Sequence, residues 1–450
     1  MNILMPKPIT INKKIEEFNK KIQVDGDKSL SIRFVLLASQ AIGKSKAFNI
    51  LHSADLISSI NILRKLGIKI FLNKNYCEVY GQGVNGFHYK KNLTLDAGNS
   101  GTLGRCILGC LIRSPYKIKL VGDTSLSKRD FSRIIKPLQE FGANFYPKRK
   151  KTLPIYIKGT NLVRPINFQD KIGSAQIKTS VCLAALNSPG ETIIKSKRCR
   201  DHTEKLFKYL KIPIKIKKEK NFDLITVRGI KKFRSFNYHI PSDPSSSAFF
   251  VMLTVLAKNS SLLIKNCLIN ENRIGFYKIL KKMGAHIIFK NRRIYKGEKI
   301  ADIFCKSAKK LRSINLSKKF NNSSMIDEFN SLFILASFSQ GISIFTGLEE
   351  LNKKESRRLD WGFKILKMIG VKTKKIGNHG IKIWGNPNLK LNKKYILKNY
   401  LRDHRIAMCT VILALARGGN WKIYDMDSVK TSFPSFLKIV KYLGGKYENN

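Results

Sequence analysis

Six times along this chain, a leucine-rich amphipathic stretch ends at a glycine or a substitute for it, and a short apolar segment follows. The spacing between successive copies varies only from 69 residues (142 to 211) to 86 residues (284 to 370). Glycine ends helices because it adopts the left-handed conformation without strain. The chain is therefore predicted to be an array of six similar units. The aligned positions are Gly67, Gly142, Lys211, Gly284, Gly370 and Gly444.

A second kind of helix is predicted at the start of each unit. Alanine, leucine and isoleucine occupy all of its faces, which is typical of a helix buried inside a layer. Alternating strand-like pieces lie between the two helices, so each unit is of the α/β class. At 450 residues the chain is long enough for two domains, and six units divide into two sets of three. The buried helices are expected near 30–41, 103–111, 177–186, 248–257, 332–338 and 406–416.

Composition excludes several classes of protein. The longest apolar runs, Phe249–Ala257 and Ala407–Ala416, are much shorter than the ~20 residues of a membrane span. The segment Met1–Lys20 is charged and lacks a sustained apolar core, so no signal peptide is expected. The eight cysteines are scattered and form no CxxC pair. We therefore expect a cytoplasmic protein with reduced thiols, without a disulfide framework or a zinc site.

The formal net charge of +55 has two interpretations. Basic proteins neutralise the phosphates of nucleic acids, so one interpretation is nucleic-acid binding. The other is a lysine-rich composition spread over all solvated faces. Basic runs such as Arg149–Lys151 and Lys374–Lys375 fall beside strand-like segments, and no zinc finger, helix-turn-helix or RNA-recognition signature accompanies them. We favour the second interpretation, under which a positive surface still attracts small anions.

A polar segment precedes each buried helix. Serine, threonine, asparagine and aspartate are common N-caps, so capping alone is the simplest explanation at any single position. Capping does not require the lysine, arginine and glutamine found there, whereas helix N-termini suit phosphate and carboxylate groups. If the repeats are pseudo-symmetric, the six starts should converge on a site for two anionic ligands. The segments are 26–29, 98–102, 173–176, 242–247, 323–328 and 402–405.

Eight short motifs resemble, in type and in order along the chain, those of the 5-enolpyruvylshikimate-3-phosphate synthase family (3-phosphoshikimate 1-carboxyvinyltransferase, EC 2.5.1.19), in its second bacterial class. The resemblance implies a two-domain inverse α/β barrel with three repeats per domain. Domain one would hold residues 1–23 and 243–450, domain two residues 24–242, and the active site would lie in the cleft between them. The motifs are Gly26–Arg33, Gly98–Thr102, Ser174–Gln176, Asp201–Glu204, Gly347–Leu351, Lys354–Ser356, Asp403–Arg405 and Thr431–Pro434.

The family reaction adds the 5-hydroxyl of shikimate 3-phosphate to C2 of phosphoenolpyruvate, protonates C3 and expels phosphate, in the pathway to chorismate and the aromatic amino acids. Each substrate carries a phosphate and a carboxylate, and their repulsion in a dry site costs several kcal/mol. Arginine and lysine must offset it. The resemblance implies no cofactor or metal. From composition we expect no nucleic-acid or membrane partner, and we expect a monomer. An enolpyruvyl transferase acting on a UDP-amino sugar is the nearest rival.

Carried over by motif, Asp327 is the candidate base for the 5-hydroxyl, and Glu355 and Lys28 are alternative proton donors to C3. Without the motif, Asp327 would be read as an N-cap and Glu355 as a surface ion pair. His404 is interpreted as a buried structural residue. The implied phosphoenolpyruvate ligands are Lys28, Gly101, Arg129, Gln176, Arg358 and Arg405. The implied shikimate 3-phosphate ligands are Lys28, Ser29, Arg33, Ser174, Ala175, Arg200, Asp327 and Lys354.

Four positions depart from the family pattern. Asp25 and Asp130 stand where proline is usual, Arg357 replaces an aspartate, and Thr431 replaces a lysine. The departures put in doubt the loop geometry at Asp130 and an ion pair at Arg357.

Overall fold

A computed structural model describes residues 8–317 and 320–449. Residues 1–7 of the expected first domain lie outside these ranges. The chain divides into two compact units. Unit 1 comprises Met1–Asp25, Ser242–Arg293 and Lys299–Asn450, and unit 2 comprises Gly26–Pro241 and Ile294–Glu298. The main chain thus passes between the units at residues 25/26 and 241/242, and a short hairpin tip of five residues, Ile294–Glu298, also belongs to unit 2.

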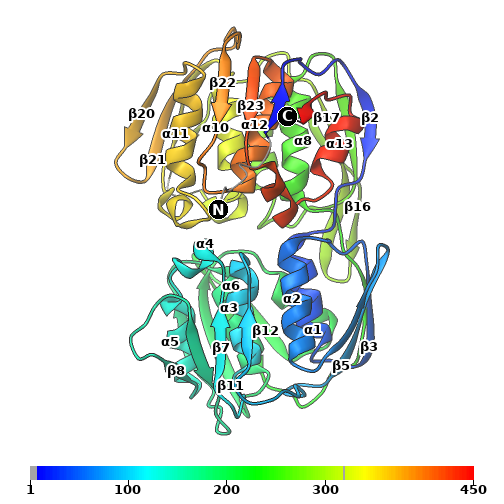
Figure 1. The fold of residues 1–450 in the computed structure, drawn as a ribbon, viewed down its shortest axis with the longest axis vertical. Helices are drawn as coiled ribbons and strands as arrows, with labels where there is room; N and C mark the ends of the chain where they lie inside the picture. The colour runs from blue at the N-terminus through cyan, green and yellow to red at the C-terminus, as the bar shows by residue number, and fades with distance from the viewer. Residues whose placement is uncertain (1–7, 318–319, 450) are drawn as a thin grey trace, which may run out of the picture. The chain divides into compact units, whose positions relative to one another are not determined.

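Six helices, three in each unit, are buried on nearly all faces. All residues of α8 (Pro244–Leu256) are buried, because its sequence is apolar or small all round. In unit 1, α8, α10 (Phe329–Ser337) and α12 (His404–Arg417) pack against one another, as Figure 1 shows. In unit 2, α3 (Gly101–Cys110) packs against both α1 (Lys28–Ala38) and α6 (Ala175–Ala185). The predicted buried helices are confirmed.

The amphipathic helices also end where the repeat predicts. After each of them, the aligned glycine adopts positive φ, from +78° at Gly370 to +110° at Gly142. Lys211, the substitute in the third copy, adopts φ +57°. The sixfold unit is therefore present in the backbone as well as in the sequence. These helices are α2 (Ala54–Lys65), α5 (Ser132–Glu140), α7 (His202–Tyr209), α9 (Gly275–Lys282), α11 (Arg358–Met368) and α13 (Phe436–Tyr442).

Three four-stranded sheets surround the buried helices of unit 2. In each sheet the first strand runs parallel to the second, and the second runs antiparallel to the third. In spatial order they are β14 (Asn237–His239), β3 (Ile42–Phe48), β5 (Tyr76–Gln82), β4 (Lys69–Leu72); β6 (Thr94–Asp96), β7 (Ile118–Val121), β9 (Ile155–Lys158), β8 (Asn144–Tyr146); and β10 (Asn167–Asp170), β11 (Glu191–Lys197), β13 (Phe222–Arg228), β12 (Ile214–Lys218).

Unit 1 repeats this arrangement with the same parallel and antiparallel order. Its sheets are β2 (Asn19–Ile22), β15 (Ser261–Leu268), β17 (Glu298–Lys306), β16 (Ile287–Tyr295); β18 (Asn315–Leu316), β19 (Gly341–Phe345), β21 (Gly380–Gly385), β20 (Thr373–Ile376); and β22 (Lys394–Leu397), β23 (Asn420–Ile423), β1 (Ile9–Ile11), β24 (Glu448–Asn449). With helices inside and sheets outside, each unit has the expected inverse α/β architecture.

The tip of the β16–β17 hairpin, Ile294–Glu298, belongs to unit 2. Glu298 is fully buried. Its Oε1 lies 2.6 Å from His202 Nδ1, and its Oε2 lies 3.0 Å from Lys205 Nζ. His202 comes from the Asp201–Glu204 motif, so this part of the motif anchors the hairpin tip. In the described ranges no helix is long and apolar enough to span a bilayer. All eight cysteines are buried thiols.

Candidate functional site

Three helix starts meet in unit 2 at the residues that the motifs single out. The first is that of α1, where Asp27 Oδ1 accepts a hydrogen bond from Leu30 N at 2.8 Å and caps the helix. Lys28 is the first residue of α1, and its Nζ lies 3.1 Å from Asp55 Oδ2. Asp55 lies in the first turn of α2 and is buried. The ion pair fixes the direction in which the Lys28 ammonium points.

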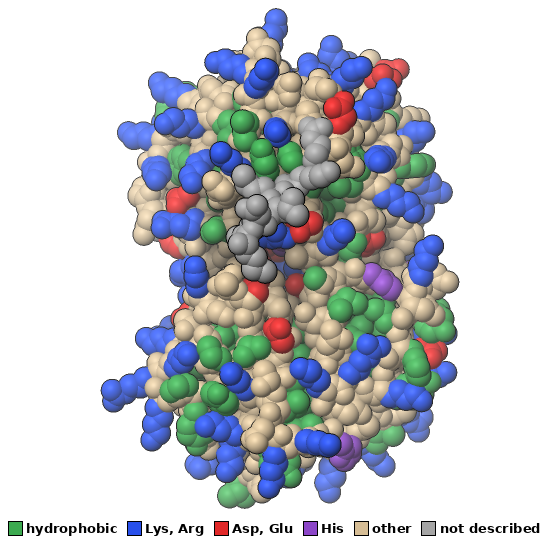
Figure 2. Space-filling model, in the orientation of Figure 1, with side chains coloured by type: hydrophobic (Ala, Val, Ile, Leu, Met, Phe, Trp, Pro, Cys, Tyr) green, Lys and Arg blue, Asp and Glu red, His purple; other side chains and the backbone are tan. Residues whose placement is uncertain are grey.

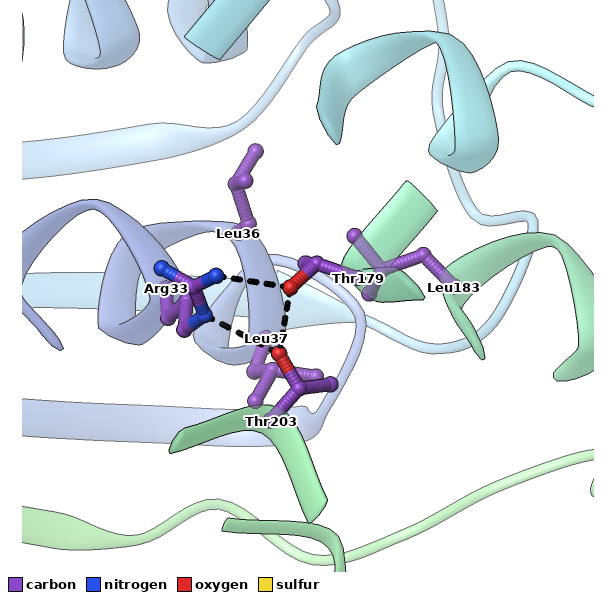
Figure 3. Close-up of a pocket in the computed structure, with 6 residues that line it drawn as sticks. All are labelled: Arg33, Leu36, Leu37, Thr179, Leu183 and Thr203. Atoms are coloured by element: carbon purple, nitrogen blue, oxygen red, sulfur yellow. Dashed lines mark hydrogen bonds between the residues drawn. The ribbon is translucent and has the colours of Figure 1, made fainter. Parts of the chain in front are cut away.

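Arg33 ties the first and third repeats of unit 2 together (Figure 3). Its Nε donates to Thr203 Oγ1 at 2.9 Å and its Nη2 to Thr179 Oγ1 at 2.7 Å. It also donates to the carbonyl oxygens of Ser29 (3.0 Å) and Ala175 (3.4 Å). The side chains around Arg33 leave no room for a water molecule, and only 3% of the residue is exposed, so it is packed rather than solvated. Because all four acceptors are neutral oxygens, its positive charge still attracts an anion at the two helix starts.

Gln176, in the first turn of α6, is held by two residues of α3. Its Oε1 accepts from Arg105 Nη1 at 2.8 Å, and its Nε2 donates to Thr102 Oγ1 at 3.1 Å. Burial lowers the pKa of Arg105 to about 10, and the nearby Arg129 and Arg133 add to this effect. Concentrated positive charge at this helix start suits an anionic ligand.

Gly101 opens α3 directly beneath two guanidinium groups. A Cβ built on it would lie 2.9 Å from Arg129 Nη1 and 3.0 Å from Arg105 Nη1. A larger residue would therefore push these groups from their places. Ser100 caps the helix through Leu103 N. Next to Arg129, Asp130 accepts from Ser132 N (2.7 Å) and Oγ (2.9 Å). Asp130 thus supplies the start of α5 with hydrogen bonds in the place of the usual proline.

The remaining predicted ligands of unit 2 lie at the start of α6 and before α7. Ser174 caps α6 through Ile177 N, and its own N–H donates to Asp170 Oδ2 at 2.7 Å. Arg200 is half-buried and precedes Asp201, the N-cap of α7. The structure thus brings Arg33 to the backbone of Ser29 and Ala175. It also brings Gly101 to Arg129 and Arg105, and Arg105 in turn holds Gln176, whereas Lys28 is held by Asp55.

In unit 1 a single buried arginine binds three carboxylates. Arg358 is 2% exposed and begins α11. Its Nε lies 2.9 Å from Asp403 Oδ2, its Nη1 3.1 Å from Asp327 Oδ1, and its Nη2 2.6 Å from Glu355 Oε2. The two predicted catalytic carboxylates, Asp327 and Glu355, therefore share one guanidinium. The arrangement can hold two acid–base groups side by side in a fixed orientation.

Arg405 approaches the same carboxylate from α12. Its Nε lies 3.7 Å from Asp327 Oδ1, and its Nη1 donates to the Asp327 carbonyl oxygen at 3.4 Å. The alternative reading of Asp327 as an N-cap does not hold, because the N-cap of α10 is Glu328 and this position makes no side-chain capping bond. Asp327 is thus positioned by two arginines.

Asp403 is the fully buried carboxylate of this cluster. It caps α12 through Arg405 N at 3.0 Å and accepts from Ser356 Oγ at 2.8 Å. Burial by itself raises the pKa of Asp403, but the Arg358 guanidinium lowers it by more. The pKa of Asp403 therefore lies below its ordinary value. Burial alone would lower the pKa of Arg358, and the carboxylates of Asp403, Glu355 and Asp327 raise it overall. Both groups stay charged near neutral pH.

Three residues near this cluster concern the sequence departures and the His404 interpretation. Arg357 is exposed and pairs with Asp360 at 2.7 Å, so it does not join the cluster. Thr431 Oγ1 lies 3.2 Å from His404 Nδ1 and donates to the Ser428 carbonyl oxygen. His404 is 4% exposed, in agreement with a buried structural histidine.

The remaining predicted ligand of unit 1 is Lys354. It follows the short helix η2 (Glu349–Lys353) and is half-buried.

Sequence reasoning missed four supporting residues. Asp403 and Thr203 stand in recognised motifs but were given no role, whereas Arg105 and Asp55 lie outside the motifs. Arg105 lies one helical turn after Gly101, a spacing that places two residues on one face and could have identified it. Another buried pair, Lys178 and Glu204 at 2.5 Å, links α6 to the second half of the Asp201–Glu204 motif. Among the described residues, no cluster of three or more histidine, cysteine, aspartate or glutamate side chains could hold a metal ion.

Comparison with known proteins identifies the family. The family model of EPSP synthase (3-phosphoshikimate 1-carboxyvinyltransferase) matches residues 12–440. A 3-phosphoshikimate 1-carboxyvinyltransferase of Bartonella tribocorum is 36% identical over 444 residues, which cover 98% of each chain. One from Persephonella marina is 36% identical over 427 residues, covering 94% of this chain and 97% of that protein.

Solved structures give the same result. EPSP synthase from Acinetobacter baumannii superposes with a TM-score of 0.86 at 32% identity, covering 98% of this chain and 99% of the other. The enolpyruvyl transferase NikO from Streptomyces tendae shares the fold at 13% identity with a TM-score of 0.76, covering 99% of each. Full-length matches at this identity, together with motif residues gathered at the helix starts of both units, mean that the chain belongs to the EPSP synthase (3-phosphoshikimate 1-carboxyvinyltransferase) family.

Proposed function

We propose that this chain transfers the enolpyruvyl group of phosphoenolpyruvate to the 5-hydroxyl of shikimate 3-phosphate. The 5-oxygen bonds to C2 of phosphoenolpyruvate while C3 gains a proton. A proton is then lost from C3 and the bond between C2 and the phosphate oxygen breaks, which releases phosphate and leaves the enolpyruvyl ether. The observation that carries the proposal is the pair Asp327 and Glu355 on one buried arginine, in a chain of this family.

The helix starts of unit 2 supply positive charge for the anionic groups. Lys28 and Arg33, with the backbone of Ser29 and Ala175, suit shikimate 3-phosphate, together with Ser174 and Arg200. Gly101, Arg129 and Gln176 suit phosphoenolpyruvate, because Arg105 presents Gln176 to the same place. Helix N-termini add partial positive charge, and electrostatic stabilisation of this kind is a large part of catalysis in anionic chemistry.

The groups of unit 1 supply the proton transfers. Asp327 accepts the proton of the 5-hydroxyl, and Lys354 binds the same substrate. Glu355 or Lys28 delivers the proton to C3. Arg358 and Arg405 take the anionic groups of phosphoenolpyruvate, and Arg358 also keeps Asp327 and Glu355 in place. A general acid or base at hydrogen-bonding distance contributes about 10²-fold to 10⁴-fold to the rate.

A phosphate-release assay with two acceptors tests the proposal. Release of phosphate from phosphoenolpyruvate is expected with shikimate 3-phosphate and not with a UDP-amino sugar. Release with the UDP-amino sugar alone would instead assign the chain to the rival transferase activity.

Three substitutions test the roles of the acid–base groups. Lys28→Met, Asp327→Asn and Glu355→Gln are each expected to lower kcat by on the order of 10²-fold or more, because each removes a proton-transfer group. Arg357→Gln is the matched control, since this neighbouring arginine is largely exposed and pairs with Asp360. Near-normal turnover in one of the three variants would remove that residue from the mechanism.

A further inference from the structure

Unit 2 contains a cavity that the proposed reaction does not use. It lies at the C-terminal end of α3, between the loop that follows β5 and the turn that follows α3. Its volume is about 220 Å³. An apolar cavity of about 150 Å³ holds a benzene molecule, so this space is sufficient for a molecule with one ring. The lining residues are Asn85, Phe87, Tyr89, Cys110, Leu111, Arg113, Ser114, Pro115 and Asn161.

Arg113 gives this cavity its chemistry. The residue is half-buried, and its Nε is buried without a hydrogen-bond partner among the described residues. A buried donor on a charged group is costly to leave unsatisfied, and such groups in native structures usually have a partner. Arginine presents its donors in a planar fork that matches a carboxylate. Because Nε is shut off from solvent, a ligand in the cavity cannot reach it, and an anion there would instead pair with the terminal Nη1 and Nη2 atoms of Arg113.

Two aromatic rings form another part of the wall. Phe87 and Tyr89 both line the cavity, and the Tyr89 hydroxyl is held at 2.5 Å by Ser114 Oγ. The Tyr89 ring also packs edge to face on Tyr116, with centroids 6.1 Å apart. The orientation of Tyr89 is therefore fixed without a ligand. Such walls favour a flat ring over a flexible chain, because stacked and edge-to-face contacts need planar partners.

We propose that this cavity binds a small carboxylate that carries one planar ring. The carboxylate pairs with the Arg113 guanidinium, and the ring packs on Phe87 and Tyr89. The amide side chains of Asn85 and Asn161 offer further hydrogen bonds. The C-terminal end of α3 is slightly negative and repels a free anion, so the positive charge of Arg113 is required for binding.

The cavity is separate from the substrate-binding residues of the same unit. Gly101 and Cys110 are the first and last residues of α3, which at 1.5 Å per residue places the two sites about 14 Å apart. The proposal therefore does not rest on the proposed function.

Isothermal titration of the full-length protein with benzoate at low ionic strength tests the proposal. We expect one site with a Kd on the order of 0.1 to 1 mM, as befits so small a ligand. Benzamide, which keeps the ring without the charge, and acetate, which keeps the charge without the ring, are each expected to bind at least about tenfold more weakly.

Variants locate the site. Arg113→Gln is expected to weaken benzoate binding at least about tenfold, whereas Arg228→Gln, at the exposed end of β13, leaves it unchanged. Asn161→Trp should block the cavity from an exposed rim position without touching the core, which keeps the test valid if Arg113→Gln unfolds. Lys28→Met should still bind benzoate. If Lys28→Met lost benzoate binding while Arg113→Gln and Asn161→Trp kept it, benzoate would lie in the substrate site and the proposal would be overturned. Binding of acetate or benzamide as tight as that of benzoate would also overturn it.

Discussion

At the scale of single residues, Arg358 explains how three carboxylates can lie together in unit 1. Asp327, Glu355 and Asp403 would repel one another without it, and Asp403 is fully buried. A buried charge is tolerated only when it is paired and hydrogen-bonded, and Arg358 provides both to Asp403. The same guanidinium then orients the two proposed acid–base groups. Stability and proposed catalysis thus depend on one side chain.

Asp403→Asn tests this dependence through pH. Asparagine keeps the N-cap oxygen of α12, so the change removes chiefly the charge opposite Arg358. We expect a loss of about 3 kcal/mol at pH 7, the lower end of the range for a broken buried pair, because Arg358 loses its fully buried partner but keeps Asp327 and Glu355. The folded-state pKa of Asp403 is lowered, so its contribution is present above the unfolded pKa of about 4 and is lost as pH falls through the folded value.

Urea unfolding at pH 7 and at pH 3 measures both effects. The wild-type protein should lose more stability than the variant over this interval, since the variant has no charge at position 403 to titrate. Equal pH dependence of the two proteins would contradict the assignment.

Gly101→Ala tests the start of α3. The added methyl would lie within about 3 Å of the Arg129 and Arg105 guanidinium groups, which can move because they end flexible side chains. We therefore expect a folded enzyme with a KM for phosphoenolpyruvate raised roughly tenfold, about 1.4 kcal/mol of binding. Inhibition by glyphosate, a competitor of phosphoenolpyruvate in this family, should weaken similarly. Steady-state kinetics measure both, and unchanged inhibition would place position 101 outside the pocket.

At the scale of elements, the sequence predicted what is local. The end of each amphipathic helix follows from one position with positive φ, and the six apolar helices follow from their composition. The sequence did not predict which strands pair with one another. β14 joins the sheet of β3, and β1 lies between β23 and β24, so each connects segments far apart in the chain. Strands of three residues, such as Ile9–Ile11, are too short for a periodic pattern to identify their partners.

The site shows the same division. Ser100, Ser174, Asp27, Asp243 and Asp403 cap helices as their residue types suggest. The partners that orient the functional groups come from other elements: Asp55 for Lys28, Arg105 for Gln176, Thr203 for Arg33. Nothing local in the sequence indicates such a pairing, because it depends on how the helices pack. The roles of Asp327 and Glu355 came from family position alone.

The ends of the amphipathic helices provide a matched pair of substitutions. Lys211 has φ +57°, a conformation that costs a residue with a Cβ roughly 1–2 kcal/mol. Lys211→Gly removes this cost but loosens the unfolded chain, so we expect a net gain of about 0.5–1 kcal/mol. Gly370→Ala is expected to lose about 1 kcal/mol, and through backbone strain alone, because no atom lies within 4 Å of the added Cβ. Thermal unfolding midpoints should shift in opposite directions; a shift of the same sign would contradict the shared helix ending.

At the scale of the whole molecule, the dominant property is charge. There are 85 lysine and arginine residues against 30 aspartate and glutamate. Figure 2 shows the basic side chains scattered over the visible face rather than gathered in one stripe. This distribution fits the interpretation of a generally basic composition better than that of a nucleic-acid groove, which needs clustered lysine and arginine.

The charge has a kinetic consequence that salt can expose. A positive field raises the rate at which anionic substrates arrive, and salt screens it, with a Debye length of about 10 Å at 0.1 M and about 3 Å at 1 M. We expect kcat/KM for phosphoenolpyruvate to fall several-fold between about 0.02 and 0.5 M potassium chloride, with kcat changing much less, because the ion pairs around Arg358 are buried and poorly screened. Potassium sulfate would compete as a divalent anion, so chloride is the appropriate salt. A binding titration with a mixed oligonucleotide pool under the same conditions supplies the control. If nucleic acid bound tightly at 0.15 M salt while kcat/KM ignored ionic strength, the positive surface would serve a polyanion rather than the small substrates.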